Sequence, residues 1–346
     1  MDVTAEGDLP TLRRWLDGVE NHPLRWFFKS RRREPLPPGA VYAWWRNPIL
    51  TPIEETLVLL EAAAPAGLGA KRREFRATRG MGQLAMERFM PLRAELIVAS
   101  LLAEATVPFR FNTGAGPDLL VGGDSPAFGI EIGSRCPSSL SQLSRALSAA
   151  LRERGLPDGV EIRTDPIPPV AIREVVQRSI IERFVPPDGS PGVTSLRVMA
   201  APARPADGIP ASWLTIRRGG STTSSMAPYN SPHMLALAQS VAVEVLRDER
   251  KIRQSQTVPT LLIVDLSGGD LPDVRYWETT FGPLWQPTDT YLALGAMRAL
   301  TTRRVPEIRF SVNPYADKDA IRVAAVRLRG VAALADLANH RDRPPR

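Results

Sequence analysis

The chain has 346 residues and a hydrophobic content of 43%, which suits one large or two ordinary globular domains. No apolar run reaches the roughly 18–20 residues of a membrane span, so we expect no membrane partner. The first residues lack the basic start and apolar segment of a signal peptide, and the single cysteine, Cys136, excludes an intrachain disulfide. These features favour a cytoplasmic protein.

The formal net charge is +7, and arginine supplies nearly all of the basic residues. Arginine binds phosphate well through its planar fork of donors, so the charge is compatible with nucleic-acid binding. The codon usage of a GC-rich genome explains the same excess of arginine. With one cysteine and three scattered histidines, the sequence has no cluster of ligands for an ordinary intrachain zinc site.

Helical and strand patterns alternate along the chain, which predicts an α/β fold with a mixed central sheet flanked by helices. Residues 1–80 combine short helical patterns, basic clusters and proline breaks, and we expect them to form an N-terminal helical and basic extension. A core follows at 81–165. Its predicted elements are a helix over 84–105, strands over 109–112, 118–121 and 128–132, a helix over 138–154 and a strand over 160–163.

Residues 166–336 continue in the same style, and we expect a C-terminal α/β elaboration packed on the core. A long helix is predicted over 233–254. The apolar run at 259–266 is typical of a strand buried on both faces. Residues 337–346 are expected to be a frayed tail.

Two carboxylates lie on neighbouring predicted strands of the core. Asp118 follows Pro117 at the start of one strand, and Glu131 lies between Ile130 and Ile132 on the next. Carboxylates on adjacent strands can hold a hard divalent cation such as Mg²⁺, which prefers oxygen ligands. In the alternatives that involve no metal, Asp118 is a turn residue after a proline and Glu131 is a solvent-facing strand residue.

The sequence Gly116-Pro117-Asp118-Leu119-Leu120-Val121, followed by Gly129-Ile130-Glu131-Ile132-Gly133, resembles the core of the PD-(D/E)XK nuclease-like (restriction endonuclease-like) superfamily. The resemblance implies an α-β-β-β-α-β core and Mg²⁺- or Mn²⁺-dependent hydrolysis of DNA, in restriction, defence or repair. It implies Asp118, Glu131 and the Ile132 carbonyl as metal ligands. It also implies a catalytic role for Glu95, in the preceding helix.

Glu104 competes with Glu95 for this role, but it lies nine residues further on, roughly on the opposite face of the predicted helix. The two glutamates therefore cannot both serve one site.

The chain departs from the superfamily's pattern at the lysine position, which is Gly133 here. Lys251 is our first candidate for a replacement, together with Gln254 on the same side of the predicted helix. Arg135 is a second candidate, although its fixed charge makes it a poor base. An inactive site is the third outcome.

Two basic clusters of the N-terminal region, together with an arginine of the core, are candidate DNA contacts. They comprise Lys29, Arg31, Arg32 and Arg33 beside Trp26–Phe28, then Arg72 and Arg73, and finally Arg135. Basic residues next to aromatic ones can follow a phosphate backbone, and a solvated surface explains the same pattern.

We therefore expect a Mg²⁺-dependent nuclease that acts on DNA. One alternative is a catalytically inactive nuclease-fold protein that binds nucleic acid or scaffolds a complex. The other is a partner-binding α/β protein without a nucleic-acid role. The sequence leaves open whether the protein forms a homodimer or binds a partner protein.

Overall fold

The computed structural model is an α/β protein that divides into two compact units. The described residues are 9–25, 28, 49–80, 83–123, 125–134, 140–165, 174–201, 212–219, 223–224, 246–248, 252–253, 255–266, 280–300 and 302–339. Unit 1 comprises Met1–Ser134, Arg247–Ser267 and Trp285–Arg346, and unit 2 comprises Arg135–Leu246 and Gly268–Leu284. Unit 2 is thus inserted into the sequence of unit 1.

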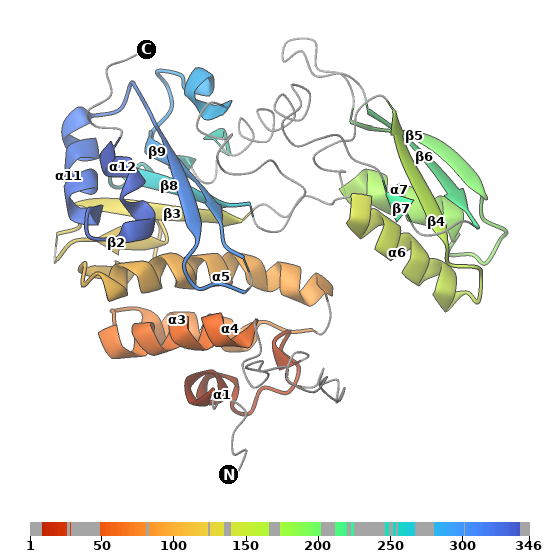
Figure 1. Ribbon diagram of the computed structural model, residues 1–346, viewed down its shortest axis with the longest axis horizontal. Coiled ribbons are helices and arrows are strands. Elements are labelled where there is room, and N and C mark those ends of the chain that lie inside the picture. The colour runs from red at the N-terminus through yellow and green to blue at the C-terminus, as the bar shows by residue number, and fades with distance from the viewer. Residues whose placement is uncertain are drawn as a thin grey trace, which may run out of the picture. The chain divides into compact units, whose positions relative to one another are not determined.

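The core of unit 1 is a mixed six-stranded sheet with the order β1-β2-β3-β8-β9-β10 (Figure 1). Its strands are β1 (Phe109–Phe111), β2 (Leu119–Val121), β3 (Phe128–Ser134), β8 (Thr260–Asp265), β9 (Tyr291–Arg298) and β10 (Glu307–Val312). The first three strands pair antiparallel, β3, β8 and β9 run parallel, and β10 returns antiparallel to β9. Every residue of β8 is buried, which confirms the strand predicted from the apolar run at 259–266.

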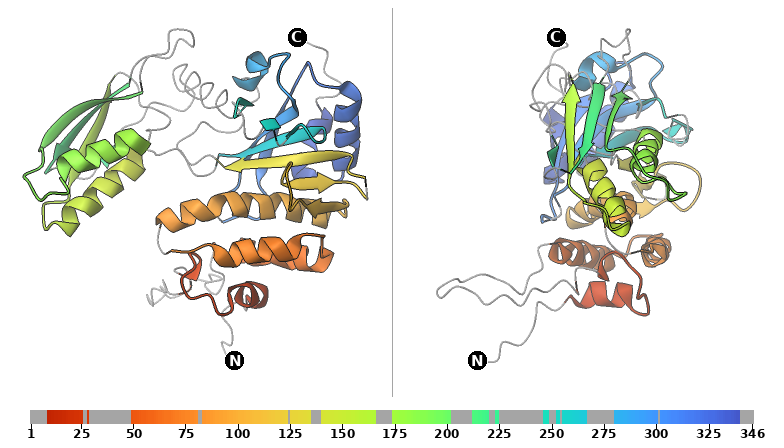
Figure 2. Two further views of the ribbon diagram at one scale, coloured as in Figure 1. Left: turned by 180° about the vertical axis from the view of Figure 1, so that it is seen from behind. Right: turned by 90° about the vertical axis from the view of Figure 1, so that its right-hand side faces the viewer.

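Helices pack around this sheet, and those that precede β1 in the sequence form successive layers on it (Figures 1 and 2). They are α1 (Pro10–Leu16), α3 (Leu50–Ala63), α4 (Leu68–Ala77), α5 (Gln83–Glu104), α11 (Lys318–Leu328) and α12 (Asp336–Asn339), with a 3-10 turn at Ala332–Leu334. The long helix α5 contacts β1 and β3, α3 packs on α5, and α1 packs on α3 and α4. Within the stretches that the structure describes, none of the helices has the length and hydropathy required to cross a bilayer.

The N-terminal segment, expected to be an extension, is part of the core of unit 1. Leu12, Trp15 and Phe75 are fully buried and belong to the same apolar cluster as α5 and the sheet. The ring of Trp15 meets that of Phe75 edge to face at 5.1 Å between centroids. These contacts hold α1 and α4 together.

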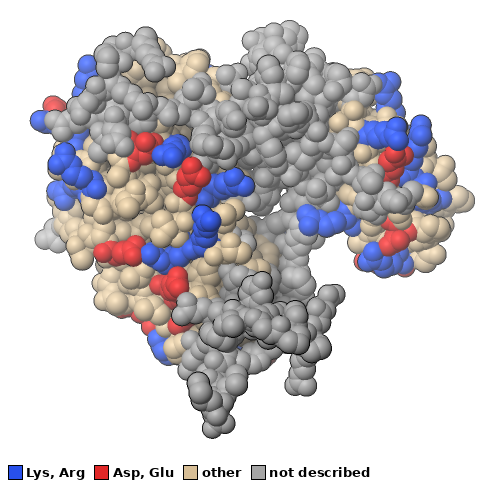
Figure 3. Space-filling model, viewed as in Figure 1, with Lys and Arg blue, Asp and Glu red and all other residues tan. Residues whose placement is uncertain are grey.

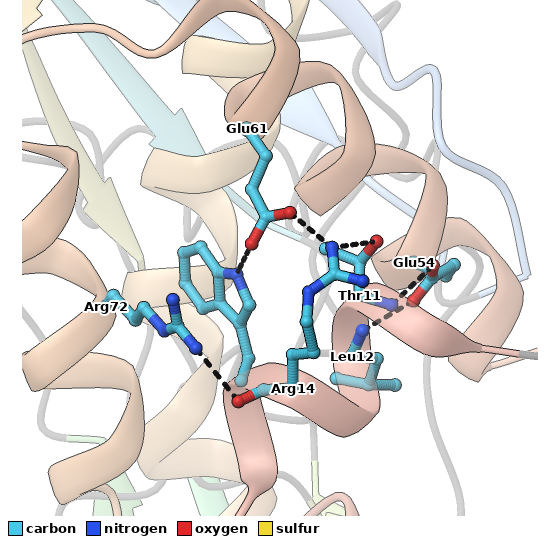
Figure 4. Close-up of polar contacts among 7 residues, drawn as sticks. Thr11, Leu12, Arg14, Glu54, Glu61 and Arg72 are labelled. Carbon is cyan, nitrogen blue, oxygen red and sulfur yellow. Dashed lines mark hydrogen bonds and ion pairs between the residues drawn. The ribbon is translucent and has the colours of Figure 1, made fainter.

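Two acidic side chains of α3 fix α1 in place (Figure 4). The carboxylate of Glu54 accepts hydrogen bonds from the backbone amides of Thr11 (3.0 Å) and Leu12 (2.6 Å). These amides belong to the first turn of α1 and have no partner within the helix, so a buried anion there is favourable. Two turns after Glu54 on α3, Glu61 accepts a hydrogen bond of 2.8 Å from the indole of Trp15.

His22 is a buried structural residue of this region. Its Nδ1 accepts a hydrogen bond of 3.2 Å from the Leu24 amide, so Nε2 carries the proton and donates to the Phe75 carbonyl at 3.0 Å. Burial lowers the pKa of His22 from 6.5 to about 4, and the hydrogen bond to Phe75 only partly opposes this. His22 is therefore neutral at pH 7.

Unit 2 contains a four-stranded sheet with the order β5-β6-β4-β7. Its elements are α6 (Leu140–Glu153), β4 (Val160–Asp165), α7 (Glu174–Phe184), β5 (Ser195–Ala201), β6 (Ser212–Arg218), β7 (Thr223–Ser224) and a 3-10 turn at Gly282–Leu284. Leu143, Leu147 and Leu151 form the buried stripe of α6, as their spacing predicts. Together with α7 they cover one face of the sheet (Figure 1).

Two expectations about domain organisation are corrected. The helix and strand predicted at 138–154 and 160–163 do form, but they belong to unit 2 and not to the core that contains β1–β3. The strand that pairs parallel with β3 is instead β8. Likewise, residues 337–339 are not a frayed tail, because they form most of α12 and Leu337 is buried.

The pKa of His22 predicts a pH-dependent contribution to stability. The unfolded chain takes up a proton on His22 near pH 6.5 and the folded chain only near pH 4, so stability should fall as the pH drops through this window. The loss amounts to at most about 3 kcal/mol. Chemical unfolding of the wild type and His22→Gln at pH 7.5 and pH 4.5 should show that the stability advantage of the wild type shrinks at the lower pH. An equal advantage at both pH values would contradict this prediction.

Candidate functional site

Asp118 and Glu131 lie opposite each other at the end of the β2–β3 pair that is remote from the connecting turn. In the antiparallel register, Leu119 pairs with Ile130, so the next position along brings Asp118 to the level of Glu131. Directly opposite residues in an antiparallel pair lie on the same face, with Cβ atoms about 4.5–5.5 Å apart. Asp118 is half-buried, and Glu131 is only 2% exposed.

A close backbone contact sets the position of Asp118. Pro117 packs on Gly129 of β3 so tightly that a Cβ at Gly129 would lie 2.3 Å from the Pro117 ring. The Ile132 amide then donates a hydrogen bond of 2.7 Å to Oδ2 of Asp118. The contact between Ile132 and the acidic pair is therefore made by its N–H, whereas the resemblance implies a role for its carbonyl.

Tyr291 is a neighbour of this pair that the sequence analysis did not identify. It begins β9 and is fully buried. Burial, followed by the negative charge of Glu131, raises the pKa of its hydroxyl above the ordinary range. Tyr291 therefore stays neutral and keeps its proton beside the carboxylates.

Glu95, predicted as an assisting residue, forms an ion pair with Lys71 of α4. Both side chains are nearly buried, with exposed fractions of 11% for Glu95 and 12% for Lys71. Lys71 also donates a hydrogen bond of 2.9 Å to Glu74, one turn along its own helix. The ammonium group is thus held between two carboxylates.

The electrostatics connect Glu95 of this ion pair to Asp118. Burial and the like charge of Asp118 raise the pKa of Glu95, and Lys71 only partly offsets them. Burial acts to lower the pKa of Lys71, but Glu95 and Glu74 outweigh it and the net shift is upward. Lys71 is therefore protonated at neutral pH, next to a cluster of acidic side chains.

The start of α4 determines where Lys71 lies. Gly67, which precedes the helix, has a φ of 85°, and a Cβ there would lie 2.7 Å from the Phe111 carbonyl oxygen. The Phe111 amide donates a hydrogen bond of 2.9 Å to the Ala66 carbonyl. The helix therefore starts directly against β1.

Lys71 was not predicted as a site residue, because it lies in the basic run Lys71-Arg72-Arg73, of which Arg72 and Arg73 were taken as candidate DNA contacts. Phe75 was the available signal. It is the only large apolar side chain in the second half of α4, and it is fully buried. Lys71 lies one turn earlier, on the same face.

The predicted DNA contacts have different outcomes. The guanidinium of Arg72 donates a hydrogen bond of 3.0 Å to the Arg14 carbonyl and lies over the ring of Trp15, so it helps to hold α1 (Figure 4). Arg73 is exposed. The other predicted residues lie outside the described part of the chain: Lys29, Arg31, Arg32, Arg33, Arg135, Lys251 and Gln254. On the described surface visible in Figure 3, basic and acidic side chains are interspersed.

Glu104 is separate from the site, as its position on α5 predicts. Both of its carboxylate oxygens bind the guanidinium of Arg304, at 3.0 Å and 2.7 Å. Glu95, by contrast, interacts electrostatically with Asp118.

Asp118 and Glu131 fit Mg²⁺ as a pair of carboxylates. Within the described residues, no group of three or more His, Cys, Asp or Glu side chains is arranged to hold a metal ion. Mg²⁺ often binds through only one or two carboxylates and completes its octahedron with water and substrate phosphates. The number of carboxylates in the cross-strand pair is compatible with this smaller requirement.

The buried ion pair gives a testable prediction for stability. We expect Lys71→Met to destabilise the fold by about 2–4 kcal/mol, because it leaves Glu95 buried without its cation. The double variant Lys71→Met/Glu95→Leu should recover most of this loss in urea unfolding. Glu74→Gln is the matched control: Glu74 is half-exposed, so removing its charge should change stability by less than about 0.5 kcal/mol. Additive effects of the Lys71 and Glu95 substitutions would show that the two side chains are not coupled.

Comparisons with known proteins identify no relative of this chain. The chain matches no family model, and no curated protein or solved structure shows significant similarity to it.

Proposed function

We propose that unit 1 hydrolyses DNA phosphodiester bonds with Mg²⁺ held by Asp118 and Glu131. The observation that carries this proposal is the register of β2 and β3, which places the two carboxylates opposite each other. The hydrogen bond from the Ile132 amide orients Asp118. A protonated lysine beside the third carboxylate, Glu95, supplies the positive charge that Gly133 cannot.

The proposal includes a restriction-endonuclease-like core, assembled from elements that are distant in sequence. The helix α5, the antiparallel strands β1–β3 and the strand β8, parallel to β3, correspond to its first helix, three strands and last strand. The remaining helix of such a core would be the one predicted over 233–254, most of which lies outside the described residues.

In this proposal each side chain has a separate task. Bound Mg²⁺ supplies Lewis acidity and makes a bound water more acidic. Asp118 and Glu131 bind the cation, and the Ile132 amide keeps Asp118 in its orientation. The Lys71 ammonium, held by Glu95, would stabilise the negative charge that develops on the phosphate.

A second candidate function is a nuclease-fold protein that binds nucleic acid or a partner without cleaving. The same ion pair favours it, because Glu95 and Glu74 already balance the charge of Lys71. Gly133 on β3 favours it as well, since the superfamily has a lysine there.

A cleavage assay on the full chain separates the two functions. With Mg²⁺ or Mn²⁺ and a labelled DNA substrate, Asp118→Asn and Glu131→Gln should each lower the rate at least about 100-fold, about 3 kcal/mol of transition-state stabilisation. Glu104→Gln is the matched control on α5 and should cut like the wild type. Equal cutting by Asp118→Asn would refute the assignment. A wild type that binds DNA and never cuts it would favour the second function.

A further inference from the structure

One face of the unit 2 sheet carries α6 and α7, and the opposite face is solvent-exposed. Side chains alternate between the two faces of a strand. Val160 and Ile162 of β4, Leu196 of β5, and Leu214 and Ile216 of β6 all point into the apolar cluster with the helices. The residues between them therefore point to the other face.

The residues of this open face line up across the strands. One row joins Arg163, Thr215 and Arg197, and the next joins Glu161, Arg217 and Ser195. All three arginines are exposed. These six positions hold three basic side chains and one acidic side chain. Arg163 forms an ion pair of 2.6 Å with the acidic one, Glu161.

The next row of the same face joins Asp165, Trp213 and Met199, so it adds one acidic, one aromatic and one apolar residue. The guanidinium of Arg197 lies over the ring of Trp213, 4.9 Å from its centroid. Trp213 is half-buried and Arg197 is exposed, so the planar guanidinium is the outer layer of this stack. Nucleobases stack on aromatic rings and on guanidinium planes of this kind.

The composition of the face identifies the kind of partner. A second sheet or a helix would need an apolar surface, but Met199 is the exposed large apolar residue among the described positions of this face. Arginines around a stacking platform instead match a phosphate backbone with accessible bases. In a duplex the flat faces of the bases are covered by their neighbours, whereas a single strand exposes them.

We propose that the open face of the unit 2 sheet binds single-stranded DNA. Arg163, Arg197 and Arg217 contact phosphates, and one base stacks on the Arg197–Trp213 pair. This binding site lies within unit 2 and needs no cleavage by unit 1.

The test measures binding of a fluorescent oligothymidine to the full chain in EDTA, in an Asp118→Asn background. The double variant Arg197→Ala/Arg217→Ala should bind at least about 10-fold more weakly, and its slope of log K against log salt should be shallower by roughly 1.4, about 0.7 for each lost phosphate contact. Arg178→Ala/Arg183→Ala is the matched control. It removes the same charge from exposed positions on α7, across the sheet.

The following outcomes decide the proposal. Selective loss of affinity and slope in the Arg197/Arg217 variant, with an unchanged thermal unfolding curve, supports it. The single variant Arg217→Ala, which leaves the Arg197–Trp213 stack intact, should give about half of the change in slope. Equal affinities for both double variants would overturn the proposal. If a DNA duplex competes as strongly as the single strand, the proposal is overturned and the partner is a duplex. If polyglutamate competes as strongly, the proposal is also overturned and the partner is an acidic protein. Because no cleavage is measured, a failed nuclease assay leaves this result unaffected.

Discussion

The register between β2 and β3 is the constraint on which the candidate site depends, because it serves the apolar core and the carboxylates together. Leu119 and Val121 of β2 are buried in the cluster beneath α5, opposite Ile130 and Phe128 of β3. A slip by one residue would turn the β2 side chains to the wrong face and carry Asp118 with them. Pro117 on Gly129 adds a steric stop. The packing that stabilises the sheet therefore also places the acids.

The second determinant of the site is a helix from the N-terminal region. Because α4 starts against β1, Lys71 reaches the glutamate of α5 instead of solvent. A buried cation between carboxylates is not strong evidence for stabilisation in itself, since desolvation opposes the attraction of the charges. The electrostatic interaction of Glu95 with Asp118 is more informative: burial and then the like charge of Asp118 raise the pKa of Glu95.

Local patterns in the sequence predicted most of the elements, but not their partners. The helix ending in Glu104, the strands that carry Asp118 and Glu131, and the apolar strand that became β8 could all be predicted from periodicity and turn residues. The pairing of β3 with β8 could not, because the strand predicted at 160–163 is nearer in sequence and was assigned to the core instead. Lys71 was missed for the same reason: its partner Glu95 lies on a different helix, and helical spacing carries no information about contacts between helices.

The insertion of unit 2 has a consequence for how the chain folds. β3 leaves the ribosome well before β8, its parallel partner in the middle of the sheet, and the intervening residues form a core of their own. Pairings between residues so distant in sequence raise the contact order, which slows folding. During synthesis the backbone groups of β3 that pair with β8 therefore stay unpaired until β8 has been made. The nascent chain would need a chaperone most at the stage when its N-terminal half has been made and β8 has not.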